Sequence, residues 1–193
     1  MVGAIIGDIV GSIYEFDNHK SKEFDLFKKD SAFTDDTVMA IAVAEFLLLQ
    51  RQKSQPRLCG YLDHWFKEFP HIHKTYGLNF IKWLKQFENV RYVDYKKGNS
   101  FGNGAAMRVS SLAQLTSDVM YTAKYVTEVS HNHPEGIKGA QATAGACRMA
   151  LYGRSKKQIK ETIEKDFGYD LNNTVANLKK TYVYNETCQA TVP

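Results

Sequence analysis

Thr34-Asp35-Asp36-Thr37 leads directly into an apolar run, Val38–Leu49, that carries a single charge. The run is too short to span a bilayer, and it predicts a buried helix. Thr34 is a good N-cap for this helix, and Asp35 and Asp36 then lie in its first turn, where the helix dipole favours negative charge. A capped core helix explains the pattern. A magnesium site explains it as well, because carboxylate and hydroxyl oxygens suit hard divalent cations.

Length and composition indicate one globular domain over residues 1–193, with room for a sizeable core. The net charge of +4, from 25 basic and 21 acidic residues, is too small to argue for a nucleic-acid partner. Three widely spaced cysteines without a CxxC motif suit a reducing compartment. No basic region precedes the apolar N-terminus, so we expect no signal peptide, no membrane partner and a cytoplasmic location.

The N-terminal segment reads as a helix through residue 16, with glycines and acids at regular spacing. Gly3, Gly7 and Gly11 recur every four residues and form one stripe, where another backbone can approach closely. Because a glycine costs about 1 kcal/mol relative to alanine inside a helix, the stripe implies a packing or functional reason. Asp8 and Glu15 lie two turns apart on roughly one face. They are candidate site residues, with a solvated helix face as the alternative.

The rest of the chain shows helical periodicity and no strand alternation, repeat or linker, so the predicted fold class is all-α. Polar, aperiodic residues predict a loop at 17–30 and a break at 50–56. Apolar spacing predicts helices at 38–49, 58–69, 78–87, 109–115, 118–130, 135–152 and 154–167. Small residues on one side of the helix at 135–152 predict close contact with neighbours: Gly136, Ala140, Thr143, Ala144 and Cys147.

A glycine-rich turn, Gly-Asn-Ser-Phe-Gly-Asn-Gly-Ala-Ala-Met-Arg at 98–108, opens onto one of these helices. Such a turn exposes backbone N–H groups and favours an anion such as phosphate. The spacing matches neither the dinucleotide-binding GxGxxG pattern nor a Walker A motif. A tight turn therefore explains the glycines about as well as a phosphate site does.

Four motifs, in order along the chain, resemble those of the ADP-ribosylglycohydrolase family. They are GDxxGxxxE at 7–15, FTDDT at 33–37, SFGNGAAMR at 100–108 and SHxH at 130–133. The resemblance implies an all-helical bundle that holds two magnesium ions. It also implies magnesium-dependent hydrolysis of the glycosidic bond between ADP-ribose and a modified protein side chain or small molecule, so the expected partner is an ADP-ribose-containing substrate.

The resemblance also implies roles for individual residues. Glu15 and Asp36 would be catalytic, while Thr34, Asp35 and Asp36 would bind Mg²⁺. ADP-ribose would be bound by the glycine-rich turn and a histidine: Ser100, Phe101, Gly102, Asn103, Gly104 and His131. Carboxylates suit this reaction, because glycosidic cleavage passes through an oxocarbenium-like state.

One departure from the family pattern concerns a second metal motif of D-x-D-T type, which this sequence lacks; no aspartate follows Asp170. We therefore expect a bundle without its C-terminal helices and with at most half of the metal site. Part of the core would then be uncovered, which favours self-association or a partner. Two alternatives to an active hydrolase stay open. One is an inactive protein that binds ADP-ribose or serves as a scaffold, and the other is a helical segment without a ligand.

Overall fold

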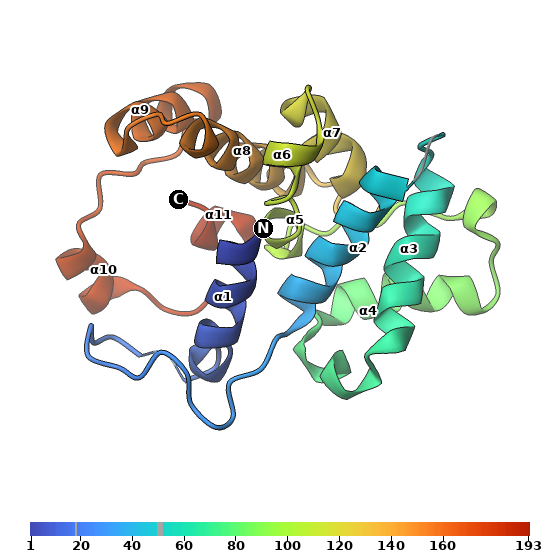
Figure 1. Ribbon diagram of the computed structural model, residues 1–193, viewed down its shortest axis with the longest axis horizontal. Helices are drawn as coiled ribbons and strands as arrows, with labels where there is room; N and C mark the ends of the chain where they lie inside the picture. Colours follow the sequence, from blue (N-terminus) through green and yellow to red (C-terminus); the bar gives the residue numbers. More distant parts are fainter. Residues whose placement is uncertain (18, 50–51) are drawn as a thin grey trace.

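The computed structural model describes residues 1–17, 19–49 and 52–193. In these ranges the chain is helical and has no β-strand, which confirms the predicted all-α fold (Figure 1). None of the described helices is long and apolar enough to cross a membrane. Asn18 of the predicted loop, and Gln50 and Arg51 of the predicted break, lie outside the described residues.

The longer helices lie close to their predicted bounds. They are α2 (Asp35–Leu49), α3 (Gln55–Glu68), α4 (Leu78–Leu84), α7 (Val119–Thr127), α8 (Pro134–Leu151) and α9 (Lys156–Phe167). The 3-10 helices are η1 (Ser12–Tyr14), η2 (Pro70–Thr75), η3 (Lys85–Glu88) and η4 (Tyr92–Asp94). The remaining helices are α1 (Val2–Gly11), α5 (Gly104–Met107), α6 (Leu112–Leu115), α10 (Val175–Thr181) and α11 (Cys188–Thr191).

Several segments differ from their predictions, three of which have a local explanation. The N-terminal helix ends at Gly11, where the Ser12 hydroxyl donates to the Ile9 carbonyl at 3.0 Å and satisfies an acceptor at the helix end. The helix predicted at 109–115 is shorter, since α6 begins at Leu112, and a turn that contains the buried Arg108 separates it from α5. The unpredicted α10 begins at the N-cap Thr174, whose hydroxyl accepts from the backbone of Asn177.

The main core surrounds α2, which confirms that this apolar run is a buried helix. Met39, Ala42, Val43 and Phe46 are fully buried. Helix α2 packs against α3, and α8 packs against α5, α6 and α7 (Figure 1). Of the small residues predicted to make close contact, Gly136, Ala140 and Ala144 are buried, whereas Thr143 and Cys147 line an open groove.

Helix α1 lies beside α2 but is not part of the core. None of its residues is buried, although its sequence is strongly apolar, and Val2 and Ile6 are 70% and 48% exposed. A Cβ atom built on Gly3, Gly7 or Gly11 would meet no atom within 4 Å. The close approach that the glycine stripe predicts is therefore not made within the described chain.

Candidate functional site

The N-terminus of α2 forms the base of the site, and Thr34 caps it as predicted. The Thr34 hydroxyl accepts a hydrogen bond from the backbone of Asp36 at 3.3 Å, and its carbonyl accepts from Val38 at 3.3 Å. Asp35 and Asp36 occupy the first turn of the helix. The helix dipole therefore favours their negative charge here.

Asp8 of α1 holds this helix end in place through four hydrogen bonds. Its carboxylate accepts from the backbone N and hydroxyl of Thr34, at 2.8 and 2.6 Å. It also accepts from the backbone N and hydroxyl of Thr37, at 3.2 and 2.6 Å. The sequence spacing placed Asp8 on the face of Glu15 but gave no signal of this role, because the two threonines lie far along the chain.

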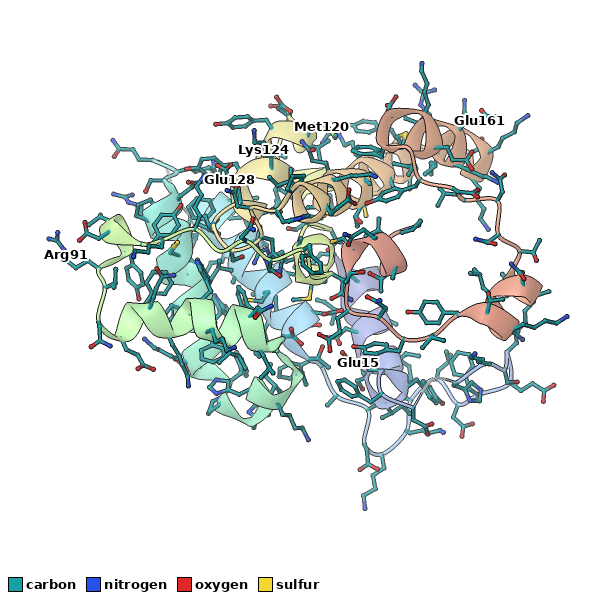
Figure 2. The ribbon with its side chains drawn as sticks, turned by 180° about the vertical axis from the view of Figure 1, so that it is seen from behind. Glu15, Arg91, Met120, Lys124, Glu128 and Glu161 are labelled. Carbon is teal, nitrogen blue, oxygen red and sulfur yellow. The ribbon has the colours of Figure 1, made fainter. Side chains whose placement is uncertain are left out.

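An open groove of about 490 Å³ lies between α1, α2, α5 and α8. Three carboxylates line it, Asp8, Glu15 and Asp36, together with the hydroxyls of Thr34 and Thr37. Figure 2 shows Glu15 among the side chains at the middle of the molecule, whereas Arg91 and Glu161 project from its edges. The other lining residues are mostly small or apolar, and they include Gly7, Gly11, Ala40, Ala106, Thr143 and Cys147.

Two of the groove carboxyls have raised pKa values. The side chain of Asp36 reaches solvent through the open groove, but the surrounding protein atoms still reduce its hydration. This desolvation, and the charges of Asp8 and Glu15, raise the pKa of Asp36 to about 7. Burial raises the pKa of the half-buried Glu15 as well, with further contributions from Asp8 and Glu186. Both groups can therefore exchange protons closer to neutral pH than ordinary carboxyls.

Asp35 does not line the groove, but the charges of Asp36 and Glu15 in the groove act on it. It is buried, and its backbone N–H donates to the Thr75 hydroxyl at 3.2 Å. Burial and the neighbouring charge of Asp36 raise the pKa of Asp35 to about 8. The structure thus gathers Glu15, Thr34 and Asp36 in the groove, with Asp35 on the inner side of the same helix turn.

The four acidic side chains of this cluster have no protein counter-ion among the described residues. Across the described ranges, no lysine, arginine or histidine forms an ion pair with Asp8, Glu15, Asp35 or Asp36. Uncompensated carboxylates and a free hydroxyl lone pair suit a hard cation. However, no three His, Cys, Asp or Glu side chains of the described residues converge to hold a metal. The donor set therefore fits an ion that keeps most of its water ligands.

The glycine-rich turn lies beside this groove, because α5, which follows it, supplies Ala106 and Met107 to the lining. Within the turn, the Ser100 hydroxyl accepts from Gly102 N at 3.1 Å, and the ring of Phe101 is 45% exposed. His131 is buried against the same turn. The five turn residues predicted to bind ADP-ribose, 100–104, therefore lie close in space to the sixth, His131.

The C-terminal segment also contacts the site, which the sequence patterns did not indicate. Asn103 N donates to the Glu186 carbonyl at 2.7 Å, and Cys188 N donates to the Phe101 carbonyl at 3.0 Å. The Tyr184 hydroxyl lies 3.5 Å from Glu15 Oε1. These pairs are far apart in sequence, and no local periodicity reports them.

Helices α1, α2, α5 and α8 thus surround a groove lined by carboxyl groups, with the glycine-rich turn at its side. The sequence profile of the ADP-ribosylglycohydrolase family matches residues 1–190. The chain therefore belongs to the ADP-ribosylglycohydrolase family, as its four motifs indicated.

Curated relatives share this similarity at low identity. The chain is 28% identical over 185 residues to "ADP-ribosylhydrolase ARH3" of Homo sapiens, a match that covers 82% of this chain and 50% of that protein. It is 26% identical over 190 residues to the Gallus gallus protein of the same name, over 82% and 51%. It is 30% identical over 139 residues to the "Uncharacterized protein YegU" of Escherichia coli (strain K12), over 68% and 41%. The chain thus spans about half the length of the curated relatives it matches.

Proposed function

We propose that the groove binds an ADP-ribose conjugate and that the chain hydrolyses its glycosidic bond. The observation that carries this proposal is the pair Glu15 and Asp36, two carboxyls with raised pKa values in one groove beside a glycine-rich turn. Family membership supports the same reaction class. The possible conjugates share the ADP-ribose part and differ in the leaving group bonded to the ribose.

The reaction requires two proton transfers. The bond between the anomeric carbon of the ribose and the leaving group breaks, and a water oxygen bonds to that carbon. The water loses a proton, and the leaving group gains one. We assign these transfers to Glu15 and Asp36, because burial raises the pKa of both carboxyls and so moves their proton exchange toward neutral pH.

Mg²⁺ is the proposed cofactor, held by Thr34, Asp35 and Asp36 with waters in the remaining positions. The uncompensated charge of the acidic cluster supports this assignment, and Mg²⁺ often binds through one or two carboxylates. When bound, it would orient ribose hydroxyls and lower the pKa of a bound water. Asp8 would keep Thr34 and Thr37 in place through its four hydrogen bonds.

The glycine-rich turn is the proposed seat of the diphosphate and distal ribose. The Ser100 hydroxyl, the Asn103 side-chain amide and the Gly104 N–H would supply the donors, because the backbone N–H groups of Gly102 and Asn103 already donate to Ser100 Oγ and to the Glu186 carbonyl. The exposed ring of Phe101 offers a face on which a base can stack. His131 would donate a hydrogen bond to the ligand from behind the turn.

A turnover assay tests the proposed reaction. ADP-ribosylated serine and arginine peptides would be incubated with the chain and Mg²⁺, and released ADP-ribose would be quantified. Glu15→Gln and Asp36→Asn are each expected to lower the rate by about 100-fold or more, since each removes a proton-transfer group. Asp25→Asn, on the exposed loop, is the matched control. Unchanged turnover in both groove variants would contradict the assignment.

Binding without turnover is a second candidate function. It is favoured by the finding that no three metal-ligating side chains converge among the described residues. A chain of this kind would bind ADP-ribose and release none from a conjugate. The assay above, paired with a binding measurement, separates the two functions.

Self-association through the uncovered face of α1 is also proposed. Val2 and Ile6 are exposed, and a Cβ atom built on Gly3, on the same helix, would meet no atom of the described chain within 4 Å. A second copy covering this apolar face would remove it from water.

The proposed location is a reducing, cytoplasmic compartment. The three cysteines are free, which supports this proposal.

A further inference from the structure

Arg108 is a fully buried cation without an acidic partner among the described residues. Its Nη2 donates to the carbonyls of Val126 and Thr127, both at 3.2 Å, and to the hydroxyl of Ser130 at 2.9 Å. Its Nε and Nη1 have no hydrogen-bond partner in the described part of the chain. Burying an uncompensated charge is costly, so packing alone does not explain an arginine here.

Ser130 lies between Arg108 and the ring of His131. The distance between Ser130 Oγ and His131 Nδ1 is 2.8 Å. Arginine has no acceptor, so Arg108 must donate to the serine oxygen. The serine proton then has His131 Nδ1 as its acceptor, the one within reach among the described residues. Because Nδ1 accepts, the neutral ring carries its own proton on Nε2.

His131 Nε2 faces the glycine-rich turn. A Cβ atom on Gly104 would lie 3.2 Å from Nε2, and one on Gly102 would lie 3.9 Å from it. Backbone contacts fix the ring from behind: His131 N donates to Thr127 O at 2.9 Å, and His131 pairs with Asn99 in an isolated bridge. Because neither residue has a side chain, Gly102 and Gly104 do not crowd Nε2 from the side of the turn.

We propose that Arg108 and Ser130 are positioning residues that fix His131 as its neutral Nε2–H tautomer, so that it donates one hydrogen bond to a ligand held by the glycine-rich turn. The ligand chemistry is an anionic phosphate oxygen or a sugar hydroxyl. The identity of that ligand rests on the proposed function, whereas the tautomer rests on the Arg108–Ser130–His131 contacts alone.

The electrostatic surroundings agree with a neutral ring. Burial, and then the charge of Arg108, lower the pKa of His131 well below its ordinary value. Burial lowers the pKa of Arg108 to about 10, so Arg108 keeps its charge at neutral pH. The remaining ring neighbour is Phe80, whose centroid lies 6.0 Å away and which does not titrate.

The tautomer can be read directly by NMR of the full chain without ligand. Long-range ¹H–¹⁵N correlation spectra distinguish protonated from bare ring nitrogens, and His131→Gln identifies the His131 signals. We expect a protonated Nε2, a bare Nδ1 and no titration between about pH 6 and pH 8. A wild-type ring that is protonated on Nδ1, or that titrates in this range, would overturn the proposal without any variant.

Two Ser130 variants test the role of the hydroxyl. Ser130→Ala removes the donor and should shift His131 toward a mixture of tautomers, whereas Ser130→Thr keeps the hydroxyl and should restore the wild-type signals. With ADP-ribose as the probe, Ser130→Ala should weaken binding about tenfold, and Ser130→Thr should recover it. An Ala variant with wild-type tautomer and affinity would overturn the proposal. If wild type shows the expected tautomer but binds no ADP-ribose, the proposed function fails and the positioning of His131 stands.

Discussion

At the scale of single residues, Asp8 connects α1 to α2 by accepting hydrogen bonds from Thr34 and Thr37. Hydrogen bonds to a charged group are worth more than neutral ones, and the loss leaves buried hydroxyls unpaired. We expect Asp8→Ala to lower the free energy of unfolding by about 2 kcal/mol in urea titrations. Asp17→Ala, at an exposed position in the next loop, is the control. Equal stability of the two variants would contradict the anchoring role.

The raised pKa values of Asp35 and Asp36, about 8 and 7, predict how stability depends on pH. Between the ordinary carboxyl pKa and these values, the folded state holds protons that the unfolded state has released. The free energy of unfolding should therefore fall as pH rises from about 5 to 8 without divalent cations. Chemical denaturation across this range measures the slope.

Mg²⁺ should reduce this loss of stability, because the cation compensates the ionised carboxylates. Asp36→Asn should also reduce it, since the amide has no charge to develop. Asp25→Asn, at an exposed loop position, should leave the slope at its wild-type value. Stability that rises with pH over the same interval would contradict the assigned pKa directions.

At the scale of elements, α8 and α11 meet at Gly139. A Cβ atom at this glycine would lie 2.7 Å from Cys188 Sγ, so Gly139→Ala must displace α11. Gly145 is the matched control on the same helix, because its Cβ would meet Met120 Sδ at an ordinary 3.7 Å. Gly145→Ala should stabilise by about 0.5–1 kcal/mol, whereas Gly139→Ala should destabilise. Hydrogen exchange of residues 184–191 should accelerate in Gly139→Ala alone, and equal exchange would contradict the packing.

Helices with strong local signals were predictable from sequence, and those governed by distant contacts were not. The apolar run of α2 and the capped start at Thr34 depend on neighbouring residues, so pattern and capping rules found both. The break between α5 and α6 lies at Arg108, whose partners belong to a segment around Ser130. The sequence pattern within 109–115 gives no indication of that contact, so the break could not be predicted from it.

The candidate site divides in the same way. Motifs identified Glu15, Asp36 and the glycine-rich turn, because each belongs to a short local pattern. The approach of Tyr184 to Glu15 and of Glu186 to Asn103 required the three-dimensional fold. The separation of Asp35 from the groove lining could not be read from its place in the motif either, since adjacent helix residues point in different directions.

At the scale of the whole molecule, the exposed face of α1 predicts self-association. In sedimentation velocity, the 21.9 kDa chain should form a concentration-dependent larger species. Ile6→Lys should shift it toward monomer, because a charge on the apolar face opposes its burial. Leu151→Lys, at the exposed end of α8, should leave the association unchanged. A compact wild-type monomer that binds no apolar dye would contradict the prediction.

The central proposal is that the groove binds ADP-ribose and that its acidic residues recruit Mg²⁺. Isothermal titration of ADP-ribose, with and without Mg²⁺, tests it most directly when wild type is compared with Asp36→Ala and with the control Asp25→Ala. We predict Mg²⁺-dependent binding in wild type and in Asp25→Ala, with this dependence lost in Asp36→Ala. ADP-ribose binding that is indifferent to both Mg²⁺ and Asp36, or no binding at all, would contradict the claim.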